Sequence, residues 1–133
     1  MRIPTEIVAA VVQEASTKMS DPNYSAVLVG GFVQTQAPAV KYITAHADDL
    51  GGPEGVVNTI FHAALLAVCF QRGYKRTVRK ITFDELDHVA GPDREETLKV
   101  QQPAILEYIE ANVEVPAMRG VLVLLTLAME WVS

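Results

Sequence analysis

An asparagine and a histidine one helical turn apart are the residues best suited to bind or activate a ligand. Asn58 and His62 are four positions apart in the most apolar segment of the chain, so on a helix their side chains share one face. Such a pair can orient a ligand or accept a proton near neutral pH. His46 precedes a Gly-Gly turn that would bring it to the same end of a bundle as Asn58.

These three residues form the candidate ligand-binding site, and a small-molecule or metal-dependent enzyme built around His46 and His62 is one functional hypothesis. The simpler interpretation is that Asn58 and His62 satisfy each other, or bond to a carbonyl of a neighbouring helix, as buried polar groups do. We favour this second interpretation.

A basic cluster is the second candidate site. A patch of this kind can neutralise phosphates, and Tyr74 within it could stack on a base. Alternatively, its first two cations complement the C-terminal end of a helix, and the others pair with the acids at positions 84, 85 and 87. The downstream acids and the net charge of -5 disfavour nucleic acid as a partner. The cluster comprises Arg72, Lys75, Arg76, Arg79 and Lys80.

No catalytic motif is recognisable. Glu85 and His88 have the Glu-x-x-His spacing of di-iron bundles, which require two such pairs, but the sequence has only one. Glu107 and Glu110 are expected on a solvated face. Cys69 lies among apolar residues, where burial raises the pKa of a thiol and makes it unreactive. The sequence predicts no catalytic residue, no metal site and no cofactor, and it favours a protein that is not an enzyme.

Two segments must form helices with almost no polar face, 53–74 and 116–132. A helix that is apolar all round is central in a bundle or lies at a subunit contact. A chain of 133 residues hides one such helix easily but two only with difficulty, so an apolar patch should remain for a partner. We therefore predict a protein that acts by association, as a homo-oligomer or with a protein partner. The candidate interface residues are Val121, Leu124, Leu125, Ala128 and Trp131.

The remaining helices are placed by apolar spacing and by capping residues. Segment 23–36 is ambiguous because Gly30-Gly31 could turn a hairpin within residues 25–36. The Asp21-Pro22 start favours a helix instead. The fold prediction is therefore all-α: a single domain, residues 1–133, made of five to seven helices with the two apolar helices at its centre. An α+β fold with strands from 25–36 and 76–83 is the alternative. Further helices are expected at 4–19, 23–36, 38–50, 83–90 and 93–113, the last kinked or split at Pro103.

Composition and cysteine usage place limits on compartment and class. The chain is 50% hydrophobic and 20% charged, which excludes an intrinsically disordered protein. A single cysteine cannot form an internal disulfide, and the first residues do not resemble a signal peptide, so we expect a cytoplasmic protein. The apolar stretch 120–129 would span only about 15 Å as a helix, and we expect no membrane span.

Overall fold

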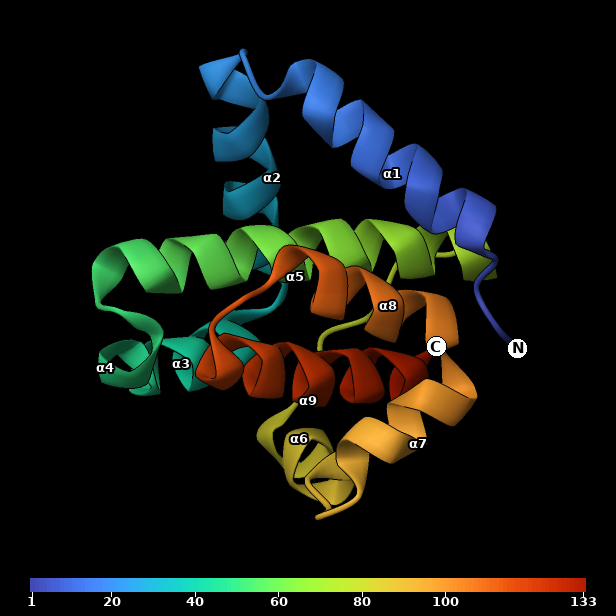
Figure 1. Ribbon diagram of the computed structural model, residues 1–133. Coiled ribbons are helices and arrows are strands. Elements are labelled where there is room, and N and C mark those ends of the chain that lie inside the picture. Colours follow the sequence, from blue (N-terminus) through green and yellow to red (C-terminus); the bar gives the residue numbers. More distant parts are fainter.

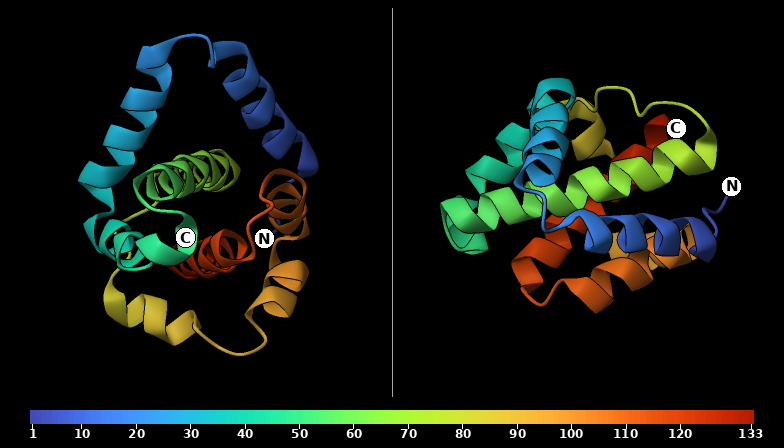
Figure 2. Two further views of the ribbon diagram at one scale, coloured as in Figure 1. Left: turned by 60° about the vertical axis from the view of Figure 1, so that its left-hand side comes forward. Right: turned by 90° about the horizontal axis from the view of Figure 1, so that it is seen from above.

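Two helices form the centre of an all-α bundle. In the computed structural model, which describes residues 1–133, α5 (Pro53–Tyr74) packs along α9 (Pro116–Val132). Every residue from Val121 to Met129 is buried. The left panel of Figure 2 shows α5 and α9 nearly end-on, with the other helices in a ring around them. The predicted fold class and the central position of the two apolar segments are thus confirmed.

The outer helices cover the central pair in order along the chain (Figure 1). The first two lie on α5, the next two cover one end of the bundle, and the sixth and seventh cover α9. The eighth fills the space between α1 and α9. These helices are α1 (Thr5–Lys18), α2 (Pro22–Thr35), α3 (Ala37–Ala45), α4 (Ala47–Leu50), α6 (Phe83–Val89), α7 (Arg94–Gln101) and α8 (Pro103–Asn112).

The structure has nine helices rather than the predicted five to seven. Two predicted helices are each divided by one residue that leaves helical geometry. His46 separates α3 from α4, and Gln102 separates α7 from α8, where Pro103 occupies the first helical position. The hairpin alternative is wrong, because residues 25–36 lie almost entirely within α2 and residues 76–83 form no strand.

The helix boundaries follow the capping signals in the sequence. The Asp21 side chain accepts a hydrogen bond from the backbone N–H of Asn23 at 2.9 Å and so caps α2. Thr82 and Glu85 cap α6 reciprocally, each side chain accepting a hydrogen bond from the other residue's backbone N–H. Gly51, with a φ of 95°, ends α4 in the left-handed region that favours glycine.

Two buried glutamines fasten non-helical segments to the bundle. The Gln36 amide nitrogen donates to the carbonyl of Arg79, and its amide oxygen accepts from the backbone N–H of Ile81, both at 2.9 Å. Gln102 holds residues 1–3 in the same way: its amide oxygen lies 2.7 Å from the third backbone nitrogen and its amide nitrogen 2.8 Å from the first carbonyl oxygen. These bonds satisfy backbone groups that have no helical partner.

By length and composition, α5 could cross a membrane. The sequence argument that no apolar segment is long enough to span a membrane is therefore wrong for α5. In the bundle, 44% of its most apolar window is buried, and five other helices, α1 to α4 and α9, pack against it. A central core helix has the same length and apolar composition as a membrane span, which makes this feature weak evidence for a membrane.

Candidate functional site

Asn58 and His62 do not form the predicted pair. The His62 Nδ1 atom lies 2.7 Å from the hydroxyl oxygen of Tyr108 on α8, and burial lowers the pKa of His62. Asn58 is exposed and makes no side-chain hydrogen bond. His46 Nδ1 lies 2.9 Å from the carbonyl oxygen of Tyr42, one turn earlier. The three residues thus have separate surroundings, and neither histidine lines any of the five best-formed pockets of the structure.

The potential metal ligands and the cysteine do not form a reactive site. No group of three or more histidine, cysteine, aspartate or glutamate side chains is placed to hold a metal ion. Cys69 is buried in α5, and burial raises the pKa of its thiol to about 12. The thiol is therefore protonated at neutral pH and is a poor nucleophile.

Two cations of the basic cluster are engaged in ion pairs. A guanidinium nitrogen of Arg72 lies 2.5 Å from a carboxylate oxygen of Glu14 on α1. The Arg79 guanidinium pairs with both oxygens of the Glu85 carboxylate. Hydrogen bonds from these arginines lower the pKa of both Glu14 and Glu85. The pairing expected with the downstream acids is therefore found for Arg79, whereas Arg72 pairs with Glu14, an acid that the sequence argument did not consider.

The other three cations of the cluster form no ion pair. Lys75 ends α5 with a φ of 60°. The guanidinium carbon of Arg76 lies 6.0 Å from the centre of the Tyr74 ring. The Arg76 side chain therefore takes the place over this ring that a stacked base would need. Lys80 is exposed and forms no ion pair. No observation favours an anion or nucleic-acid site over these local roles.

The predicted interface on α9 needs correction. Val121, Leu124, Leu125 and Ala128 are buried in the chain's own core, and only Trp131 is exposed. The premise that a small chain hides two apolar helices only with difficulty is wrong here, because the outer helices surround both. Leu124→Asp would place a charge in this core and would therefore unfold the chain.

The apolar surface that remains uncovered belongs to α2 instead. Residues 22–40 contain no charged side chain, the longest such run in the sequence. Nevertheless Phe32 is the only buried residue of this 14-residue helix. Val27 is 74% exposed and Val33 is 41% exposed. The charge-free run is visible in the sequence, but helical periodicity does not reveal that the fold leaves it at the surface.

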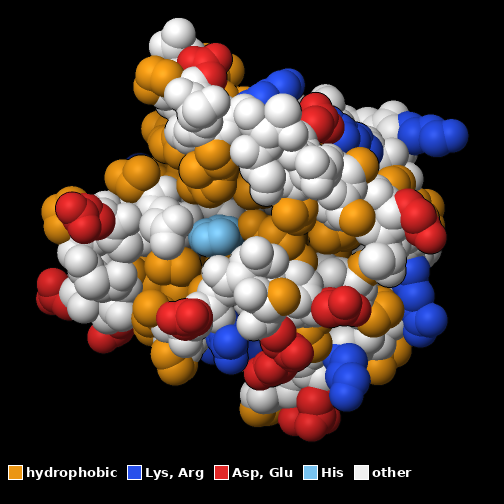
Figure 3. All heavy atoms as spheres, turned by 45° about the horizontal axis from the view of Figure 1, so that its top comes forward, with side chains coloured by type: hydrophobic (Ala, Val, Ile, Leu, Met, Phe, Trp, Pro, Cys, Tyr) orange, Lys and Arg blue, Asp and Glu red, His pale blue; other side chains and the backbone are white.

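α1 and α2 form an arch over α5 (Figure 1). Each packs on α5 but hardly on the other, and the corner between them projects from the body. Beneath the corner lies a groove of about 470 Å³, lined by Met19, Val29, Val57, Asn58 and Phe61 among others. Figure 3 shows hydrophobic side chains gathered between the projecting corner and the body below it.

A second apolar groove follows the opposite flank of α2. It has a volume of about 240 Å³ and lies between α2, α5 and the segment after α5. Its lining includes Val27, Gly31, Ala64 and Val78. α2 is an uncharged helix with apolar grooves on both flanks, and we take it as the candidate functional site. No family model, curated protein or solved structure matches this chain.

Proposed function

We propose that this protein acts by association with a second copy of itself and that α2 supplies the contact. The observation that carries the proposal is the mismatch between the composition of α2 and its exposure. All residues of α9 from Val121 to Met129 are buried and α5 has eight buried residues, whereas α2 has only Phe32 fully in the core, with Tyr24, Leu28 and Val29 partly buried against it. Burying one fully exposed valine side chain contributes about 1.5–3 kcal/mol, so covering Val27, which is 74% exposed, would favour a dimer.

The charge distribution favours a second copy as the occupant. A two-fold contact places each residue opposite the same surface of its partner, so charged side chains near the axis face charges of the same sign. The chain has a net charge of -5, and every helix other than α2 carries at least one charged side chain. α2 is therefore the helix that can face its own copy without like-charge repulsion.

Two glycines in the middle of α2 support a close contact. A Cβ atom added at Gly30 or Gly31 would meet no other atom within 4 Å, and neither residue has a positive φ. The monomer therefore gives no reason for glycine, which costs about 1 kcal/mol per residue relative to alanine inside a helix. Gly31 lies four residues after Val27 and so shares its face. A second helix could approach the backbone closely at this point.

The test is the mass of the native particle, measured by native mass spectrometry and by sedimentation. We expect the wild-type protein to have twice the chain mass of 14.5 kDa. Val27→Asp would place two negative charges opposite each other across the contact, and we expect this variant to have the mass of one chain. Val27 is 74% exposed, so the aspartate should leave the fold intact, which circular dichroism would verify.

The matched control is Val100→Asp. Val100 lies on α7 and is 64% exposed, so the same change is made at a similarly exposed valine outside the proposed contact. We expect this variant to keep the double mass. A wild-type protein with the mass of one chain, or a Val27→Asp variant that keeps the double mass, would contradict the proposal.

A further inference from the structure

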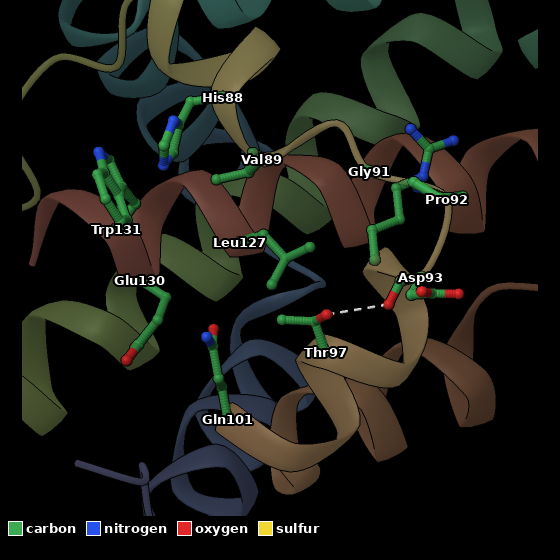
Figure 4. A pocket seen from close by; sticks show the side chains of 11 residues that line it. His88, Val89, Gly91, Pro92, Asp93, Thr97, Gln101, Leu127, Glu130 and Trp131 are labelled. Atoms are coloured by element: carbon green, nitrogen blue, oxygen red, sulfur yellow. Dashed lines mark hydrogen bonds between the residues drawn. The ribbon is translucent and has the colours of Figure 1, made fainter.

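A pocket between α6, α7 and α9 has features of a small-molecule site. Its volume is about 500 Å³, and its floor is the buried side chain of Leu127. Figure 4 shows His88 and Trp131 at one side of Leu127, and Glu130 and Gln101 at the other. An apolar floor with a few polar groups is the usual construction of a ligand pocket.

The Glu130 carboxylate is held in place by the protein. Its Oε2 atom accepts hydrogen bonds from the Tyr74 hydroxyl at 2.6 Å and from the Gln102 amide at 2.8 Å. Burial, reinforced by the hydrogen bond to Glu130, raises the pKa of Tyr74 to about 12, so this donor stays protonated at neutral pH. Both bonds end on the same oxygen. The other oxygen, Oε1, has no donor from the protein.

An aromatic wall forms the side of the pocket opposite this carboxylate. The His88 and Trp131 rings lie with their centres 4.1 Å apart and their planes at 40°, although Trp131 is 58% exposed. Stacking on the His88 ring holds the exposed indole against α6. An exposed indole held in this way offers one face to the apolar part of a ligand.

We propose that this pocket binds a primary amine that carries an apolar or aromatic body. The protonated amine donates a charge-assisted hydrogen bond to Oε1 of Glu130, and the body packs on Leu127 and the Trp131 ring. The charged side chains of the lining are Asp93, Arg94 and Glu130, a formal sum of one negative charge with histidine neutral. That sum suits a monocation, and the site is independent of the contact proposed for α2.

Trp131 makes the test direct, because it is the only tryptophan in the chain. The probe is 2-phenylethylammonium chloride, compared with 2-phenylethanol, which has the same body without the charge. Binding is followed by the emission of Trp131, excited where the phenyl ring does not absorb, and by isothermal titration calorimetry. We expect the ammonium ion to bind at least about tenfold more tightly than the alcohol, because only the ion forms the charged hydrogen bond.

Glu130→Gln removes the charge but keeps a side-chain oxygen that can accept from Tyr74 and Gln102. We expect this variant to lose the preference for the ammonium ion over the alcohol. The matched control is Glu107→Gln, the same change at an exposed residue of α8 that does not line this pocket. It should bind the probe as the wild type does.

Equal affinity of the wild type for the ammonium ion and the alcohol would overturn the proposal, as would no binding of either at millimolar concentrations. Retained preference in Glu130→Gln would also overturn it. The comparison of the two probes uses the wild-type protein, so it decides the question even where Glu130→Gln does not fold.

Discussion

A glutamine carboxamide carries one acceptor and two donors, so it can serve a backbone segment that belongs to no helix. Gln36 and Gln102 both lie at the junction of two helices and both bond to the N–H and the carbonyl of an extended segment two residues apart. Helical periodicity places Gln36 on an inward face but says nothing of its partners, because Ile81 lies 45 residues further along the chain.

We expect Gln36→Leu to lower the free energy of unfolding by about 3 kcal/mol, since a buried N–H and a carbonyl would lose their partner. Urea denaturation measures this change. The control is Gln13→Leu, at an exposed position of α1 whose side chain makes no hydrogen bond, where we expect little change. Equal effects of the two substitutions would show that the Gln36 amide contributes nothing specific.

His62 gives the stability a dependence on pH. In the unfolded chain its pKa has the ordinary value of 6.5, and in the folded chain burial lowers it. Below about pH 6.5 the unfolded state therefore binds more protons, and the free energy of unfolding decreases as the pH falls. We expect His62→Gln to lose part of this decrease between about pH 7 and about pH 5, measured by urea denaturation at each pH. An unchanged slope in the variant would contradict the assignment to His62.

At the scale of the helix, the sequence predicts boundaries better than neighbours. α5 and α9 have the predicted limits because a proline starts each one, and Gly52 and Lys75 flank α5. The pattern cannot say which apolar helix is covered, since coverage depends on how distant segments pack. For that reason the uncovered apolar surface lies on α2 and not on α9, where the sequence predicts it. For the same reason Asn58 and His62, at a correct helical spacing, have different surroundings.

Alanine substitutions at Gly30 and Gly31 should stabilise the monomer and weaken the dimer. In the Val27→Asp variant, we expect Gly30→Ala with Gly31→Ala to raise the free energy of unfolding by about 1 kcal/mol per residue, because alanine favours the helix and meets no atom of the monomer. In the wild-type background, the same pair should weaken the dimer, because the added methyl groups hold the second helix away. Sedimentation at several concentrations measures the second effect, and unchanged association would exclude the glycines from the contact.

At the scale of the whole molecule, the fold combines a covered centre with an arch, α1 and α2, in which few residues are buried. Amides of α5 and α9 should exchange with solvent only on global unfolding, and those of α2 through local opening. We expect α2 amides to exchange more slowly in the wild type than in Val27→Asp, with α9 unchanged, in hydrogen exchange followed by mass spectrometry. Identical exchange of α2 in the two proteins would mean that nothing covers this helix in solution.

The attachment of residues 1–3 to Gln102 also has a kinetic consequence. The Ile3 N–H and the Gln102 oxygen are 99 residues apart in sequence, and closing so long a loop has a high entropic cost. This contact should therefore form after the folding transition state. We expect Gln102→Ala to accelerate unfolding in stopped-flow experiments and to leave the refolding rate unchanged. A slower refolding rate would place the contact early. In this order of events, residues 1–3 attach to Gln102 as the last step of folding. Their release is the first step of unfolding.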